Sequence, residues 1–230
     1  MANPMRLVLF DIDGTLITDG GAARDAYAYA LEAVYGFRGE LRRYDFSGRT
    51  DPQITHMVLG DAGFSDQDID SVMPRLWEHY LDALQRNAPG RVRQLPGVRA
   101  LLDALAADER VLLGLLTGNI EPGARVKLGN AQLNHFFPFG AFGSDSPHRD
   151  ELPPIAVERA SRVAGHRFRG SDVVIIGDSI FDIRCGVPHA ATTIAIASGK
   201  TAAETLRAEN PHHFFHSAED RDALLAAIIG

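Results

Sequence analysis

Short apolar runs recur along the chain, separated by longer stretches with helical periodicity. The first run, LVLF at residues 7–10, is apolar at every position, which is typical of a strand buried on both faces of a parallel sheet. Strands of this kind that alternate with helices indicate an α/β fold with a doubly wound parallel sheet. Strands are predicted at residues 7–10, 111–116, 139–142, 172–176 and 192–197, and core helices at residues 95–107, 152–165 and 218–229.

The first two predicted strands are separated by about ninety residues, although a βαβ crossover needs only about a dozen. Three segments of this interval have helical patterns, at residues 23–36, 51–63 and 65–87. We therefore expect an inserted all-helical cap domain at residues 18–90. The α/β core domain is then expected to comprise residues 1–17 and 91–230.

The composition is that of an ordinary globular protein, with 45% hydrophobic and 23% charged residues among 230. No apolar run approaches the ~20 residues of a membrane span, and the N-terminal stretch lacks the pattern of a secretory signal. A net charge of −7 argues against nucleic-acid binding, which requires a basic face. We expect a cytoplasmic monomer or homodimer with neither membrane nor nucleic-acid partners.

Polar residues follow the predicted strands, where the carboxyl ends of parallel strands form one ligand-binding crevice. Aspartates from two strands offer the hard oxygen ligands that Mg²⁺ prefers. A threonine hydroxyl and the amides of a loop that opens a helix can hold phosphate oxygens, and an arginine can clamp them. The residues that this pattern brings together are Asp11, Asp13, Thr117, Gly118, Asn119, Arg149, Asp178 and Asp182.

The stretches DIDGTL, LLTGN and GDSIFD, in that order, resemble three motifs of the haloacid dehalogenase-like superfamily. The resemblance is to its phosphatases with a helical cap, of the phosphoglycolate phosphatase and β-phosphoglucomutase kind. It implies that Asp11 is the nucleophile that forms an aspartyl-phosphate, and that Asp13 is the general acid and then the base. It also implies that Mg²⁺ is held by the carboxylate of Asp11, the backbone carbonyl of Asp13 and Asp178, with Asp182 orienting the metal shell.

The sequence departs from the family at its third motif, which usually carries a lysine that neutralises the nucleophile and the phosphate. Within HRDELPPIAVERA, Arg149 occupies the place of that lysine, and the role is assigned to it. Arginine stays charged and can grip two phosphate oxygens at once. The alternative is that Arg149 faces solvent and that Lys127 or Lys200, the only lysines in the chain, supplies the cation.

The stretch SGRTD at residues 47–51 is a polar loop that opens a predicted cap helix. Similar loops in capped relatives face the active site, so Arg49 and Thr50 are expected to contact the substrate, together with Gly118 and Asn119 of the core. The alternative for Arg49 is a surface turn.

The sequence thus predicts a Mg²⁺-dependent phosphatase that acts on a small phosphorylated metabolite, with phosphoglycolate or a sugar phosphate suggested by the resemblance. A phosphomutase on the same scaffold is the nearest alternative, because it shares every core residue. A receiver-type signalling module also uses acids, Mg²⁺ and a threonine, but its chain would be about half as long and would lack the helical insertion.

Overall fold

The computed structural model describes residues 5–37 and 40–230. Residues 1–4 of the predicted core and residues 38–39 of the predicted cap lie outside the described residues. The larger sheet has the order β5-β4-β1-β6-β7-β8, and all its strand pairs are parallel, which confirms the predicted doubly wound sheet. Its strands are β1 Arg6–Phe10, β4 Val111–Leu116, β5 Gly140–Ala141, β6 Val173–Gly177, β7 Thr192–Ile196 and β8 His213–Phe215.

Strand β1 lies in the middle of the sheet, and its side chains alternate between two apolar cores. Val8 and Phe10 pack in one core with residues of the helices α4 Val98–Ala106, α5 Glu121–Asn130 and α9 Arg221–Ile229. Leu7 and Leu9 pack in the other with residues of α6 Leu152–Ala164 and α7 Ile180–Gly186. Helices therefore cover both faces, which is why this strand needs an unbroken apolar run.

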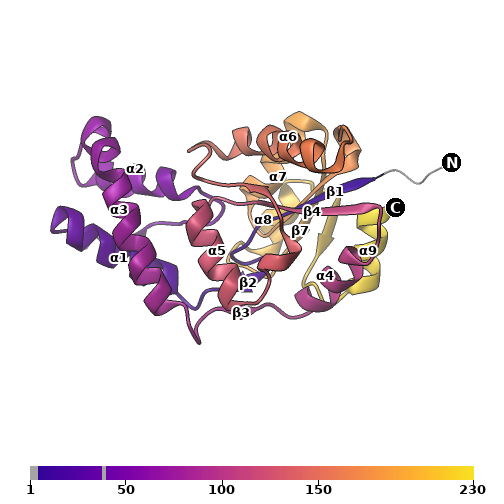
Figure 1. Ribbon diagram of the computed structural model, residues 1–230, viewed down its shortest axis with the longest axis horizontal. Helices are drawn as coiled ribbons and strands as arrows, with labels where there is room; N and C mark the ends of the chain where they lie inside the picture. Colours follow the sequence, from indigo (N-terminus) through magenta and orange to yellow (C-terminus); the bar gives the residue numbers. More distant parts are fainter. Residues whose placement is uncertain (1–4, 38–39) are drawn as a thin grey trace.

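The helical insertion comprises α1 Ala22–Tyr35, α2 Asp51–Asp61 and α3 Asp66–Asn87. In Figure 1 these helices lie together at the end of the molecule far from the carboxyl terminus. The hydroxyl groups of Thr50 and Ser65 cap α2 and α3 by accepting backbone N–H bonds. Short antiparallel strands, β2 Ile17–Thr18 and β3 Arg93–Gln94, join the insertion to the core. The predicted domain bounds at residues 18 and 90 fall close to this pair and stay a prediction.

The last strand, β8, was not predicted. Its segment is rich in histidine, and the side chain of His212 accepts a bond from the backbone N–H of Thr193 at 3.1 Å, which fixes the approach of the segment to β7. Helix α8 Ala203–Ala208 precedes it, and short 3₁₀ helices lie at Leu41–Arg43, Asn134–Phe136, Arg149–Glu151, Gly170–Asp172 and Val187–His189. Within the described residues, every helix is too short or too polar to cross a membrane.

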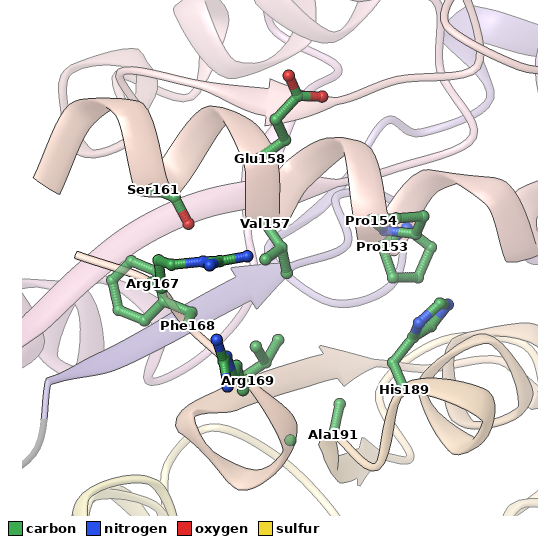
Figure 2. A pocket seen from close by; sticks show the side chains of 12 residues that line it. Pro153, Pro154, Val157, Glu158, Ser161, Arg167, Phe168, Arg169, His189 and Ala191 are labelled. Carbon is green, nitrogen blue, oxygen red and sulfur yellow. The ribbon is translucent and has the colours of Figure 1, made fainter. Parts of the chain in front are cut away.

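A cavity of about 410 Å³ lies near the amino ends of β6 and β7, where Val173 and Ala191 line it. Figure 2 shows that its walls come from α6, the segment leading into β6, and the 3₁₀ helix that carries His189. We call it the amino-end cavity. Arg167 and Arg169 lie exposed at its rim.

Candidate active site

A larger cavity, of about 510 Å³, opens at the carboxyl ends of β1, β4 and β6. We call it the carboxyl-end cavity. The core lines it with residues that include Asp11, Asp13, Asn119, Arg149 and Asp178, and the insertion lines it with residues that include Arg24, Arg49 and Asp51. The structure therefore brings together the site residues predicted from three separate strands.

The turn after β1 depends on Gly14, which has a positive φ of 86°. A Cβ atom at this position would lie 2.4 Å from Oδ2 of Asp178, so only glycine allows the turn to approach that carboxylate. The next residue, Thr15, donates a hydrogen bond from its hydroxyl to Oδ1 of Asp178 at 3.2 Å. The loops that follow β1 and β6 are thus held against each other.

Asp11 lies 6% exposed at the end of β1, next to an arginine. Nη2 of Arg149 donates to Oδ1 of Asp11 at 3.0 Å and also bonds to Oδ1 of Asp182. Backbone carbonyls of Gly48 and Leu116 accept from the same guanidinium, each at 3.2 Å. Arg149 is only 6% exposed, which excludes the alternative that it faces solvent; its catalytic role stays a prediction.

Asp13 has a different cation as its neighbour, and the sequence prediction did not place it there. Nζ of Lys127, from α5, donates to Oδ2 of Asp13 at 2.5 Å and to Oδ1 of Asn119 at 2.6 Å. The amide of Asn119 also donates to Oδ2 of Asp13, at 2.8 Å, and to Oγ1 of Thr117, at 2.9 Å. The sequence offers Lys127 only as an alternative to Arg149 for the cation of the third motif. In the structure both side chains are buried in the site.

A cluster of three buried carboxylates, from Asp11, Asp178 and Asp182, has ligand oxygens within 4.8 Å of one another. Burial raises the pKa of Asp11 to about 7, because Arg149 only partly offsets the lost hydration and the nearby acids add negative charge. Burial, followed by the charges of Asp11 and Asp182, also raises the pKa of Asp178 well above its usual range. A bound divalent cation would relieve both costs, so the residues fit a metal with hard oxygen ligands.

Asp182 differs from the other two acids because both of its oxygens have donors. Oδ2 accepts from the backbone N–H of Ser179 at 3.0 Å and from the hydroxyl of Ser179 at 2.6 Å. The same hydroxyl caps α7 by accepting from the backbone N–H of Asp182. Oδ1 is bonded to Arg149. This geometry suits the predicted role of Asp182 in orienting the site rather than binding the metal directly.

The polar loop at residues 47–51 lies against the loop after β4. The backbone N–H of Asp51 donates to the carbonyl of Gly118 at 2.7 Å, and its carboxylate accepts from the N–H of Ile120 at 2.8 Å. A Cβ atom on Gly118 would lie 2.0 Å from the carbonyl oxygen of Arg49, so this close approach requires glycine.

The two predicted substrate contacts of this loop have different surroundings. The guanidinium of Arg49 lies 5.3 Å from the ring centroid of Phe181 and lines the carboxyl-end cavity. The hydroxyl of Thr50 donates to the carbonyl of Pro147 at 2.7 Å and accepts from the N–H of Gln53 at 3.2 Å. Thr50 therefore holds the loop in place, and its contact with substrate stays a prediction.

The family model for haloacid dehalogenase-like hydrolases matches residues 8–186, from β1 to the end of α7. The chain belongs to the haloacid dehalogenase-like hydrolase family. The match includes every core residue of the predicted site and confirms the resemblance seen in the three motifs. Among curated proteins, none matches the sequence.

Solved structures similar to this hydrolase cover nearly the whole chain. A predicted phosphatase from Clostridium acetobutylicum has 17% identity and a TM-score of 0.74, covering 97% of this chain and 99% of its own. A predicted phosphoglycolate phosphatase from Haemophilus somnus 129PT has 18% identity and a TM-score of 0.71, with 96% and 98% covered. A predicted β-phosphoglucomutase from Bacteroides vulgatus has 20% identity and a TM-score of 0.67, with 98% and 91% covered. At these identities the likeness establishes the fold alone.

Proposed function

We propose that this hydrolase is a Mg²⁺-dependent phosphatase that cleaves a small phosphomonoester through an aspartyl-phosphate intermediate. The observation that carries the proposal is the pairing of charges after β1. Asp11 contacts Arg149 and Asp13 contacts Lys127, and the two pairs line one cavity with Asp178. Two carboxylates with different partners suit two different chemical roles.

In the first step, a carboxylate oxygen of Asp11 attacks phosphorus while the bond from phosphorus to the ester oxygen breaks. The proton of the Asp13 carboxyl group passes to the leaving oxygen, which departs as an alcohol. Arg149, already bonded to Asp11 at 3.0 Å, stabilises the negative charge of the phosphoryl group. The hydroxyl of Thr117 and the loop at Gly118 and Asn119 are assigned to the phosphate oxygens.

In the second step, water attacks phosphorus of the aspartyl-phosphate, and Asp13 takes a proton from that water. The bond between phosphorus and Asp11 breaks, which releases phosphate and restores the carboxylate. Asp11, the backbone carbonyl of Asp13 and Asp178 would hold Mg²⁺, with Asp182 orienting them. When bound, the ion supplies positive charge that neutralises the phosphate and the acidic cluster.

The helical insertion is assigned the recognition of the organic part of the substrate. It lines the carboxyl-end cavity with Arg24, Arg49 and Asp51, and its contact with the loop after β4 limits access of bulk water. A cavity of about 510 Å³ suits a small metabolite such as phosphoglycolate or a sugar phosphate. A cytoplasmic location and a monomeric or homodimeric state stay predictions.

A phosphomutase is the second candidate, favoured by the likeness to the predicted β-phosphoglucomutase from Bacteroides vulgatus. Its first step would be the same, but a second hydroxyl of the sugar, rather than water, would take the phosphoryl group. The length of the chain and the helical insertion disfavour a receiver-type module.

The test is a panel of phosphate esters incubated with the purified protein and Mg²⁺, with phosphate release measured. We expect turnover of small esters, loss of turnover with a chelator, and no recovery with Ca²⁺, because its larger and more flexible coordination shell misplaces the nucleophile. Full activity in chelator would overturn the metal assignment. Isomerisation of a sugar phosphate without phosphate release would favour the mutase.

A further inference from the structure

Lys127 is a buried cation with no step assigned to it so far. It lies on α5, and its side chain is 4% exposed. An ammonium group loses most of its hydration when buried, so it needs acceptors that hold it in place. Lys127 finds them in Asp13 and Asn119, both of which line the carboxyl-end cavity.

The three side chains form a closed set of hydrogen bonds around one oxygen. Oδ2 of Asp13 accepts from Nζ of Lys127 at 2.5 Å and from Nδ2 of Asn119 at 2.8 Å. Lys127 also donates to Oδ1 of Asn119 at 2.6 Å, which fixes the orientation of that amide. Oδ1 of Asp13 is buried and has no hydrogen-bond partner among the described residues. The orientation of the carboxyl group is therefore set through Oδ2 alone.

A group that transfers a proton must be held within hydrogen-bond reach of the reacting atom, and a small displacement is costly. We propose that Lys127 is a positioning residue that, with Asn119, holds Oδ2 of Asp13 and leaves Oδ1 to carry the proton that passes to the leaving oxygen. This inference rests on the proposed phosphatase function and deepens it. It also separates two cations, because Arg149 contacts Asp11 and Lys127 contacts Asp13.

The surroundings of Lys127 keep it charged and connect it to the helical insertion. Burial opposes its ammonium form, but Asp13, Tyr80, Asp19 and Asp51 outweigh burial and raise the pKa of Lys127. Of these groups, Tyr80 lies on α3 and Asp51 at the start of α2. Residues of the insertion therefore help to keep Lys127 charged.

The first test compares Lys127→Met with Lys200→Met, the same change at the other lysine of the chain. For an alkyl phosphate, we expect Lys127→Met to lower kcat by about 100-fold, and Lys127→Arg to lower it less. For nitrophenyl phosphate the loss should be only several-fold, since a good leaving group needs little protonation. The loss from Lys200→Met should be far smaller. Equal losses for both esters, or equal losses from the two lysine variants, would overturn the proposal.

A double-mutant cycle separates positioning from a general structural role. If Lys127 acts through Asp13, adding Lys127→Met to Asp13→Asn should cost little further activity. Full additivity of the two losses would overturn the inference. Thermal unfolding of each variant measures whether the fold is retained.

The second test does not depend on activity. Protein with ¹⁵N-labelled lysine has two side-chain Nζ signals, because the chain has two lysines. We expect one slowly exchanging signal, from Lys127, that moves strongly in Asp13→Asn and little in Asp11→Asn. A signal that moves equally in the two variants would refute the contact between Lys127 and Asp13. A wild-type protein that shows the signal but cleaves no phosphate ester would instead refute the proposed function.

Discussion

The two cavities of this hydrolase are of similar size, about 510 and 410 Å³, but their charged residues are arranged in opposite ways. In the carboxyl-end cavity, Asp11, Lys127 and Arg149 are buried and bonded to partners far away in the sequence. In the amino-end cavity, Arg167 and Arg169 are exposed neighbours on one segment, and Figure 2 shows Glu158 directed away from them.

The comparison teaches that volume alone does not identify a site. Burying charged groups costs free energy unless they are paired, so several segments that converge to bury acids and cations indicate a functional demand. Exposed arginines beside an apolar wall carry no such cost. The five predictions that follow test this contrast, and the first four concern the carboxyl-end cavity.

The largest loss is expected from Asp11→Asn. An amide is a poor nucleophile and a weaker metal ligand, so kcat should fall by a factor of at least about 1,000. Phosphate release over long incubations measures the loss, and thermal unfolding checks the fold. Retention of more than a few per cent of activity would refute the covalent mechanism.

Arg149→Ala should lower the rate by about 100- to 1,000-fold, because it removes a fixed cation from a buried site. Arg149→Lys should recover only part of that loss, since lysine is a point charge without the two-pronged grip of a guanidinium. Single-turnover kinetics at saturating substrate measure the effect. A nearly silent Arg149→Ala would mean that the phosphoryl group draws its cation from elsewhere.

For Asp13→Asn, the loss should depend on the leaving group. An alkyl phosphate should lose about 100-fold in kcat, because its leaving oxygen requires a proton. Nitrophenyl phosphate should lose much less. Rates measured across a series of esters give this dependence, and a loss of the same size for every ester would contradict the role of Asp13 as the acid.

Arg49→Ala should change the ranking of substrates and leave the hydrolysis of a small generic ester nearly intact. The reason is that Arg49 belongs to the insertion and lines the cavity beside Phe181. Its side chain contacts the ring of Phe181 and the carbonyl of Asp45 rather than the three clustered carboxylates. Values of kcat/KM over the ester panel test this expectation. An unchanged ranking would mean that Arg49 does not read the substrate.

The smallest effect is expected in the amino-end cavity. Arg167→Ala and Arg169→Ala should each change kcat/KM by no more than about twofold, as is usual for exposed side chains outside a site. The same ester panel provides the measurement. A tenfold loss would break the contrast between the two cavities and give this second region a part in activity.

Much of the core could be predicted from the sequence because its strands are continuous apolar runs. The runs at residues 111–116 and 172–176 correspond closely to β4 and β6. The run at residues 139–142 gave only the two-residue strand β5. Strand β8 was not predicted, because its apolar run consists only of Phe214 and Phe215 between histidines, which is shorter than the runs that mark the other long strands.

The acids of the candidate site followed strand ends, so their convergence could be predicted from the topology of a parallel sheet. Lys127 could not, because it lies inside a helix and its role depends on which way α5 faces. Its distance from Asn119 along the chain gives no signal, because Asn119 precedes the first residue of α5, Glu121, so helical periodicity does not relate the two side chains.

The insertion also has a consequence for how the chain folds. Strands β1 and β4 are neighbours in the sheet, with Arg6 opposite Val111, although about a hundred residues separate them. Bringing such distant segments together is entropically costly and slows folding. The short pair formed by β2 and β3 closes the base of the insertion, so an insertion that has already folded delivers both strands to the same place. Early formation of these helices would then turn a distant strand pairing into a nearly local one.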